Sequence, residues 1–385
     1  MGATVIWYGG ARPLRIFAAI KDPYKVQPLC PPFFLSSYRD APRLRLDGPQ
    51  SAVTLVESLR AELPRPHLSG RLPPDIMPTL LALLLVCLVG SAQLWAAAPK
   101  PPDRVEVKRN LDYAGDASPA HRLDLYLPKQ ASNHPRPLIV FIHGGGWQEG
   151  NKDSIIGLLF ALLQDGTFAG ASINYRLSNE ARWPAQIHDG KGALRWLRAH
   201  ANDYNFDPGK FGLIGISAGG HLVSLLGTSG GIPELEGTVG GNPTQSSRAQ
   251  CVINLCGVAD MNTVGAQGTI LNPEQPTSPF FKLFGGPLAQ HVKEATAASP
   301  VTYITADDPP FLHVHGTKDQ LVPIAQSLEF SAALKAQGVS STCITGKGGG
   351  HVFVTPEMLA MMRRFMQKHL LGAPVDVHDI EVPVK

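Results

Sequence analysis

Three residues with the side chains of a nucleophilic catalyst lie far apart in this chain of 385 residues. Ser217 stands in the segment Gly-Ile-Ser-Ala-Gly at 215–219, between an apolar run at 211–216 that predicts a buried strand and a helical pattern from 221. Glycines two positions before and after the serine allow a tight strand-to-helix turn that exposes its hydroxyl. An ordinary glycine-rich turn has the same pattern, so the partners of Ser217 must decide between the two interpretations.

Candidate partners follow the other predicted buried strands. His-Gly-Gly-Gly-Trp at 143–147 follows the apolar run 137–142, Asp319 follows the run 310–314, and His351 follows the strand predicted at 340–345. The carboxyl ends of parallel strands share one edge of a sheet, so we expect these groups to lie together. A serine hydroxyl needs a general base and an imidazole needs an orienting carboxylate, which assigns these tasks to His351 and Asp319.

Other histidines are weaker candidates for the base. His221 is one helical turn after Ser217, and we expect it to pack or hydrogen-bond there. His143 is expected to orient the glycine loop, and His315 to shape the turn before Asp319. Trp147 either lines the substrate pocket or only packs beneath it.

Other aspartates are weaker candidates for the acid. Asp307 and Asp308 precede their strand and therefore belong at the opposite edge of the sheet. Asp189 falls on a predicted helix as a cap or ion-pair residue. Asp260, after the strand predicted at 251–256, is the remaining alternative to Asp319.

The elements that must position these residues alternate between strands and helices. Continuously apolar runs predict strands buried on both faces, while the alternating runs 104–109 and 121–128 predict half-exposed strands near a sheet edge. This order is typical of one α/β domain with a mostly parallel central sheet flanked by helices. We predict helices at 155–163, 184–203, 323–337 and 358–371, a strand at 168–174, and irregular insertions at 227–247 and 261–300.

These motifs resemble a known family. The glycine loop 143–147, the serine turn 215–220, Asp319 and His351 occur in the chain order of the α/β-hydrolase carboxylesterases, in particular the hormone-sensitive-lipase-like and bacterial feruloyl-esterase-like branches. The resemblance covers residues 104–371. It implies an α/β-hydrolase fold, with Ser217 as nucleophile, His351 as base and Asp319 as acid.

The resemblance also implies an oxyanion hole and a rim. The backbone N–H groups of Gly145, Gly146 and Ala218 match the oxyanion hole, with Gly144 as a weaker candidate. A distinct helical cap before the first strand is not evident, which favours the feruloyl- or acetyl-esterase-like branch. The insertions 227–247 and 261–300 are then expected to form the rim of the pocket.

The first 98 residues lack the alternating strand and helix pattern of the rest of the chain. Residues 80–89 form an apolar run too short for a membrane span, followed by small residues at 90–98, which predicts a signal peptide at 77–98 cleaved near Ala92 or Ala98. A membrane anchor and an internal apolar segment are the alternatives. We expect residues 1–76 to be a non-native or disordered extension and residues 99–385 to form the catalytic domain.

Composition limits the classes of partner. Of the 34 Lys/Arg and 31 Asp/Glu residues, 10 and 6 lie in residues 1–76, so the remaining chain is close to neutral and nucleic-acid binding is not expected. Five cysteines are too few for a disulfide framework, and Cys251, Cys256 and Cys343 lack metal-ligand spacing. We expect Cys251 and Cys256 to be small buried thiols, although one disulfide among the three is compatible with export.

The sequence thus predicts an exported serine esterase that needs no metal or organic cofactor and no stable membrane span. Its expected substrate is a carboxylic ester with a short acyl, acetyl or feruloyl group, either on a small molecule or linked to a polysaccharide. A serine peptidase of the prolyl-oligopeptidase type is the alternative enzyme, and a catalytically silent binding protein with a hydrolase fold is the alternative outside enzymes.

Overall fold

The chain forms two separate units in the computed structural model, residues 1–95 and 96–385. The structure describes residues 3–6, 17–19, 44–46 and 99–384. In the first unit, β1 (Ala3–Ile6) pairs antiparallel with β2 (Phe17–Ala19) and β3 (Leu44–Leu46). The signal peptide predicted at 77–98, and the rest of the extension predicted at 1–76, lie outside the described residues.

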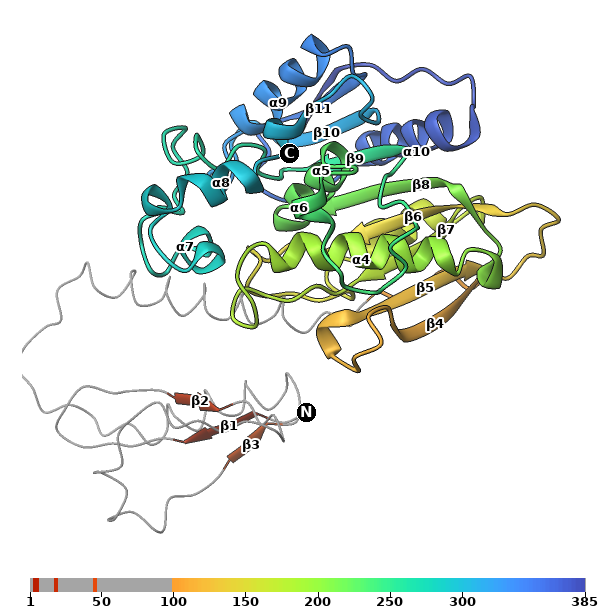
Figure 1. Cartoon of the computed structure of the whole chain (residues 1–385), viewed down its shortest axis with the longest axis horizontal. Helices are drawn as coiled ribbons and strands as arrows, with labels where there is room; N and C mark the ends of the chain where they lie inside the picture. Colours follow the sequence, from red (N-terminus) through yellow and green to blue (C-terminus); the bar gives the residue numbers. More distant parts are fainter. Residues whose placement is uncertain (1–2, 7–16, 20–43, 47–98, 385) are drawn as a thin grey trace, which may run out of the picture. The chain divides into compact units, whose positions relative to one another are not determined.

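The second unit is built on a nine-stranded sheet in the order β12-β11-β10-β9-β8-β6-β7-β5-β4 (Figure 1). The strands β6 to β12 run parallel, whereas β5 is antiparallel to both β4 and β7. The mostly parallel sheet and its α/β-hydrolase class are therefore confirmed. The strands are β4 (Val105–Asp112), β5 (Arg122–Pro128), β6 (Arg136–Ile142), β7 (Ala169–Ile173), β8 (Phe206–Ile216), β9 (Cys251–Leu255), β10 (Phe311–Gly316), β11 (Ser341–Lys347) and β12 (Ile380–Pro383).

Helices cover both faces of this sheet. Successive side chains of a strand point to opposite faces, and in β6 Val140 belongs to one hydrophobic cluster while Phe141 belongs to the other. The cluster of Val140 includes residues of α4 (Ala185–Ala199), α5 (Ala218–Thr228) and α9 (Ala325–Ala336). The cluster of Phe141 includes residues of α3 (Gly157–Leu163) and α10 (Pro356–Leu371). Among the described residues, no helix is both long and apolar enough to cross a membrane.

Most predicted elements are within one to three residues of the observed ones, but α4, β8 and β12 differ more from the prediction. Helix α4 ends at Ala199 instead of residue 203, and a 3₁₀ turn at Asn202–Tyr204 leads into β8, which begins five residues before the predicted strand. The early part of β8 is polar and exposed, so periodicity alone does not reveal it. Strand β12 was not predicted because its four residues include Pro383 and an exposed Glu381.

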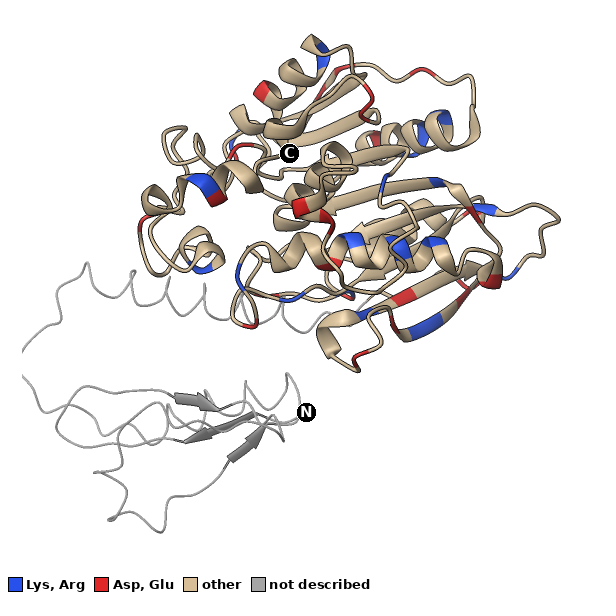
Figure 2. Ribbon diagram, in the orientation of Figure 1, with Lys and Arg blue, Asp and Glu red and all other residues tan. Residues whose placement is uncertain are grey.

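The expectation that residues 227–247 help to form the rim of the pocket is wrong. Helix α5 begins at the carboxyl end of β8 and runs back along the sheet, so the segment after it emerges at the opposite edge. This segment contains α6 (Pro233–Glu236), which lies against α4, where basic and acidic positions adjoin (Figure 2). The carboxylate of Glu236 accepts hydrogen bonds from Lys191 at 2.7 Å and Arg195 at 2.9 Å. Residues 227–247 therefore anchor α4.

Candidate active site

Ser217 sits at a sharp turn between β8 and α5. Its backbone angles are φ 55° and ψ −117°, a conformation that side chains with a Cβ rarely adopt. Its backbone N–H donates to the carbonyl of Leu255 at 2.8 Å, and its carbonyl accepts from His221 N–H at 2.9 Å. Such strain costs about 1–3 kcal/mol and persists only where the surroundings hold it. The turn is therefore a constrained platform for the hydroxyl.

The glycines around Ser217 are needed because backbone approaches backbone. A Cβ on Gly215 would lie 2.2 Å from the carbonyl oxygen of Gly219, and a Cβ on Gly219 would lie 2.1 Å from that of Ile142. Both distances are far below van der Waals contact. The spacing Gly-x-Ser-x-Gly is thus a packing requirement of this turn, and the ordinary-turn interpretation does not account for it.

The structure brings Ser217, His351 and Asp319 into one hydrogen-bonded chain. The Nε2 atom of His351 lies 2.8 Å from Ser217 Oγ, and its Nδ1 atom lies 2.7 Å from Asp319 Oδ2. The three residues come from the ends of β8, β10 and β11. Donation from His351 Nδ1 to the carboxylate leaves Nε2 free to accept the hydroxyl proton of Ser217.

The carboxylate of Asp319 is buried but fully hydrogen-bonded. Its side chain is 0% exposed, and Oδ1 accepts from the backbone N–H groups of Leu321 at 2.9 Å and Val322 at 3.0 Å. Burial would raise the pKa of Asp319, but hydrogen bonds from His315 and His351 outweigh it and hold this pKa well below its ordinary value. Asp319 is therefore ionised at neutral pH.

His315 contacts the carboxylate of Asp319, which the sequence interpretation missed. Its Nε2 atom lies 3.1 Å from Asp319 Oδ2 and 2.8 Å from the carbonyl of Val322, while Nδ1 lies 2.7 Å from Ser327 Oγ. The predicted role in shaping the turn is thus accompanied by direct contact with the acid. The spacing of four residues between His315 and Asp319 was a signal for this contact.

The glycine loop after β6 presents its backbone toward Ser217. Gly145 has φ +109° and Gly146 φ +57°, and a Cβ on Gly144 would lie 2.8 Å from the carbonyl oxygen of Ile216. Within the described chain, the N–H groups of Gly145, Gly146 and Ala218 donate to no backbone carbonyl, the last because it opens helix α5. These groups suit a developing oxyanion, where each donor is typically worth about 3 kcal/mol.

His143 supports the glycine loop, in agreement with the predicted structural role. It is buried, its Nδ1 lies 2.7 Å from the carbonyl of Gly144, and its ring stacks on Tyr175 with centroids 4.4 Å apart. Burial lowers the pKa of His143 to about 4, so the ring is neutral at pH 7. The neutral ring can donate from Nδ1 to the loop.

Trp147 and His221 form a buried pair beneath the pocket. The indole Nε1 of Trp147 donates to His221 Nδ1 at 3.1 Å, and His221 Nε2 lies 2.7 Å from the carbonyl of Ala298. Burial lowers the pKa of His221 to about 4, and both of its ring nitrogens are engaged. His221 thus packs as predicted. Trp147 is only 2% exposed, yet it also lines the pocket. It therefore both packs and contributes to the pocket wall, the two alternatives that the sequence left open.

The other candidate aspartates do not reach His351. A carboxylate oxygen of Asp260 accepts from the backbone N–H of Asn262, and Asp307 pairs with Arg248. Asp189 is buried and pairs with Arg176, as an ion-pair residue should.

The pocket in front of Ser217 has a volume of about 340 Å³. Its walls are largely apolar, and the insertion 261–300 supplies several of them, which confirms the rim expected there. Ile155 and Val352 are 49% and 48% exposed where they line it. The insertion contributes Leu271, Thr277, Pro279 and Phe280.

One group of side chains in the described chain has the spacing of metal ligands, namely Cys256, Asp319 and His351, with donor atoms within 4.8 Å of one another. Burial raises the pKa of the Cys256 thiol above its ordinary value, and a protonated thiol is a poor ligand. The hydrogen bonds of Asp319 and His351 suit a catalytic triad better. Cys251 and Cys256 are free buried thiols, as expected, and Cys343 is also free.

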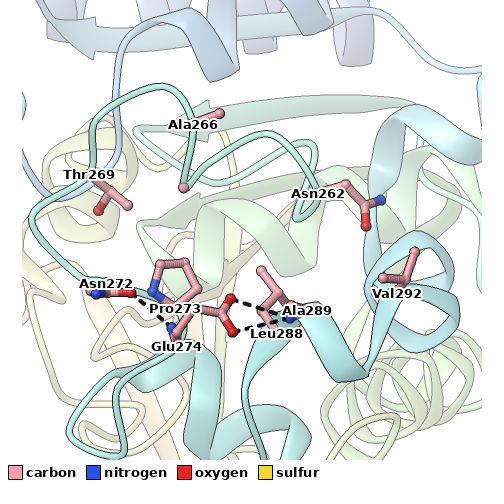
Figure 3. Close-up of a pocket in the computed structure, with 10 residues that line it drawn as sticks. Asn262, Ala266, Thr269, Asn272, Pro273, Glu274, Leu288, Ala289 and Val292 are labelled. Atoms are coloured by element: carbon pink, nitrogen blue, oxygen red, sulfur yellow. Dashed lines mark hydrogen bonds between the residues drawn. The ribbon is translucent and has the colours of Figure 1, made fainter.

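A second cavity, of about 560 Å³, lies within the insertion and contains no triad residue (Figure 3). Its one carboxylate, Glu274, accepts from the backbone N–H of Ala289 at 3.2 Å, and Asn272 accepts from the N–H of Glu274 at 3.0 Å. These bonds shape the loop. The cavity offers no nucleophile with a base beside it.

Comparison with known proteins matches the chain to a family model and to proteins named as esterases. A family model described as BD-FAE matches residues 123–334. "Probable carboxylic ester hydrolase LipM" of Mycobacterium tuberculosis is 31% identical over 64% of this chain and 59% of its own length. The chain therefore spans less than two thirds of this curated relative.

Two solved structures are also similar. A truncated carbohydrate esterase from gut microbiota has a TM-score of 0.65 at 31% identity, covering 71% of this chain and 100% of that one. A bifunctional GH43-CE protein of Bacteroides eggerthii has a TM-score of 0.64 at 36% identity, and the match covers 69% of this chain and 35% of that one.

The packing around the serine turn predicts that Gly219→Ala destabilises the protein. The added Cβ would meet the carbonyl oxygen of Ile142, so the turn must open, at a cost of roughly 3 kcal/mol. Urea denaturation measures this loss. Gly209→Ala is the control, because Gly209 is exposed in β8, the strand before the turn, and its Cβ would meet only the Asp207 side chain. Equal stability of the two variants would contradict the packing argument.

Proposed function

Because the chain belongs to the BD-FAE family, within the α/β-hydrolase carboxylesterases, we propose that it hydrolyses carboxylic esters through Ser217. The observation that carries this proposal is the hydrogen-bonded chain from Ser217 Oγ through His351 to Asp319, at 2.8 and 2.7 Å. It lies beside free backbone N–H groups in an apolar pocket.

The reaction proceeds in two halves. Ser217 Oγ attacks the ester carbonyl carbon while His351 Nε2 takes its proton, and the oxyanion accepts hydrogen bonds from the N–H groups of Gly145, Gly146 and Ala218. The imidazolium, stabilised by Asp319, then protonates the leaving alcohol as the carbon–oxygen bond breaks. Water, deprotonated by His351, releases the acid and restores Ser217.

The pocket favours a short acyl group. A volume of about 340 Å³ is at the small end of ligand pockets, and Ile155, Val352 and Phe280 offer apolar contact to an acetyl or feruloyl group. The similar solved structures named as carbohydrate esterases support a sugar as the alcohol. The relatives reported above are named as ester hydrolases, which favours an ester over the peptide of the alternative enzyme.

Export is a separate part of the proposal and rests on the apolar run 80–89 followed by small residues. The predicted signal peptide at 77–98 would leave the catalytic domain from residue 99 onward as the mature protein, in a periplasmic or extracellular location.

The triad is tested by replacing each acid candidate. Asp319→Asn leaves His351 without its orienting carboxylate, and kcat for p-nitrophenyl acetate should fall roughly 10⁴-fold. Ser217→Ala should lower it at least as far. Asp260→Asn is the matched control and should change kcat less than about twofold. Thermal melting checks that each variant is folded. Full activity of Ser217→Ala, or dependence on Asp260 instead of Asp319, would refute the assignment. No cleavage of an aminoacyl-proline amide is expected.

Export is tested by N-terminal sequencing of the secreted protein. The mature chain should begin after Ala92 or Ala98, because small residues precede both positions. A secreted chain that begins before residue 77 would overturn this proposal.

A further inference from the structure

A polar groove of about 620 Å³ adjoins the pocket of Ser217. Gln148 and Glu149 line both cavities, so the groove and the pocket share a wall directly after the glycine loop. Most of the side chains along the groove are polar. The groove is lined by Gln148, Glu149, Ser178, Asn179, Arg182, Pro276, Phe281, Lys282 and Gly285.

Several of these polar groups have no partner within the described part of the chain. Glu149, Asn179 and Arg182 are exposed, and their side chains form no hydrogen bond or ion pair with other described residues. The hydroxyl oxygen of Ser178 is buried and also lacks a partner. By contrast, the nearby Arg176 guanidinium is held by Asp189, with contacts of 2.9 and 2.6 Å. Because the side chains of Glu149, Asn179 and Arg182 are exposed, water satisfies them, and a ligand with both donors and acceptors can replace that water with direct hydrogen bonds.

The walls of the groove are fixed by the fold. The guanidinium of Arg182 lies against the backbone of Gly285, where a Cβ would come within 2.2 Å of its Cζ atom. Gly285 caps α7 (Pro279–Phe284) in a left-handed conformation, with φ +82°. The backbone N–H of Trp183 donates to the carbonyl of Leu283 at 3.0 Å, which joins the segment after β7 to this helix.

A hydrogen bond also joins the groove to the glycine loop. Lys282 Nζ donates to Gln148 Oε1 at 2.7 Å. This contact uses the amide oxygen of Gln148 and leaves its NH₂ group available as a donor. The backbone N–H of Ser178 donates to the carbonyl of Trp147 at 2.7 Å. These two hydrogen bonds therefore fix the position of the groove relative to Gly145 and Gly146.

We infer that this groove binds the sugar portion of a carbohydrate ester while its acyl group reacts at Ser217. The inference rests on the proposed function and deepens it. Sugar hydroxyls both donate and accept, which matches the donors Arg182 and Gln148, the acceptor Glu149, and the amide of Asn179. The ring of Phe281 supplies an apolar surface for the C–H face of a sugar. A fatty alcohol would displace water from these groups without replacing its hydrogen bonds, which loses affinity.

Two acetyl esters separate the groove from the catalytic chemistry. The full-length protein is assayed on p-nitrophenyl acetate and on acetylated xylo-oligosaccharide, which share the acyl group. The ratio of kcat/KM for the sugar ester to that for p-nitrophenyl acetate should fall about tenfold in Arg182→Ala, through loss of one charged hydrogen-bond donor. Asn179→Ala should lower this ratio about threefold to tenfold, and the double variant further.

Arg364→Ala is the matched control, because Arg364 is an exposed arginine on α10 that lines neither cavity. It should leave both rates unchanged. A ratio that stays constant in Arg182→Ala and Asn179→Ala, with p-nitrophenyl acetate still hydrolysed, would overturn the groove assignment. Failure of the unaltered protein to hydrolyse either ester would instead overturn the proposed function.

Binding gives an independent measurement. Isothermal titration of Ser217→Ala protein with deacetylated xylo-oligosaccharide should show saturable binding, weakened about tenfold by adding Arg182→Ala. Equal affinities for the oligosaccharide with and without the Arg182→Ala substitution, or no saturable binding, would contradict the inference.

Discussion

The buried carboxylate of Asp319 is the group on which the rest of the site depends. Its side chain is shielded from solvent, where an unpaired charge would be costly, and it is stabilised by His315, His351 and two backbone N–H groups. The contact with His351 fixes the imidazole that faces Ser217, and the contact with His315 fixes the carboxylate. Charge burial at one position thus orders groups from three strand ends.

The fold supplies the second constraint, which is close approach of backbone. The serine turn, the glycine loop and the carboxyl end of β6 pack so tightly that a Cβ at Gly215, Gly219 or Gly144 would overlap a carbonyl oxygen. This packing holds Ser217 in its strained conformation and sets free N–H groups beside it. The strain at Ser217 and the free N–H groups around it therefore have one cause.

Most of the sheet and the convergence of the site residues were predictable from sequence, because buried parallel strands are apolar throughout and catalytic groups follow their carboxyl ends. Ser217, Asp319 and His351 lie within hydrogen-bond distance, as their positions after three strands suggested. Residues 227–247 were misplaced because a loop pattern does not tell at which edge of the sheet it emerges. The contact of His315 with Asp319 and the groove beside Gln148 depend on side-chain directions, which spacing does not specify.

The central claim is that His351 and Asp319 make Ser217 nucleophilic. Stoichiometric reaction with a fluorophosphonate, followed by peptide mass spectrometry, tests it most directly, because only an activated serine reacts rapidly. We expect a single adduct on Ser217 that forms much more slowly in Asp319→Asn protein, and in Asp260→Asn protein at the same rate as in the unaltered protein. An adduct on another residue, or equal rates in the unaltered and Asp319→Asn proteins, would contradict it.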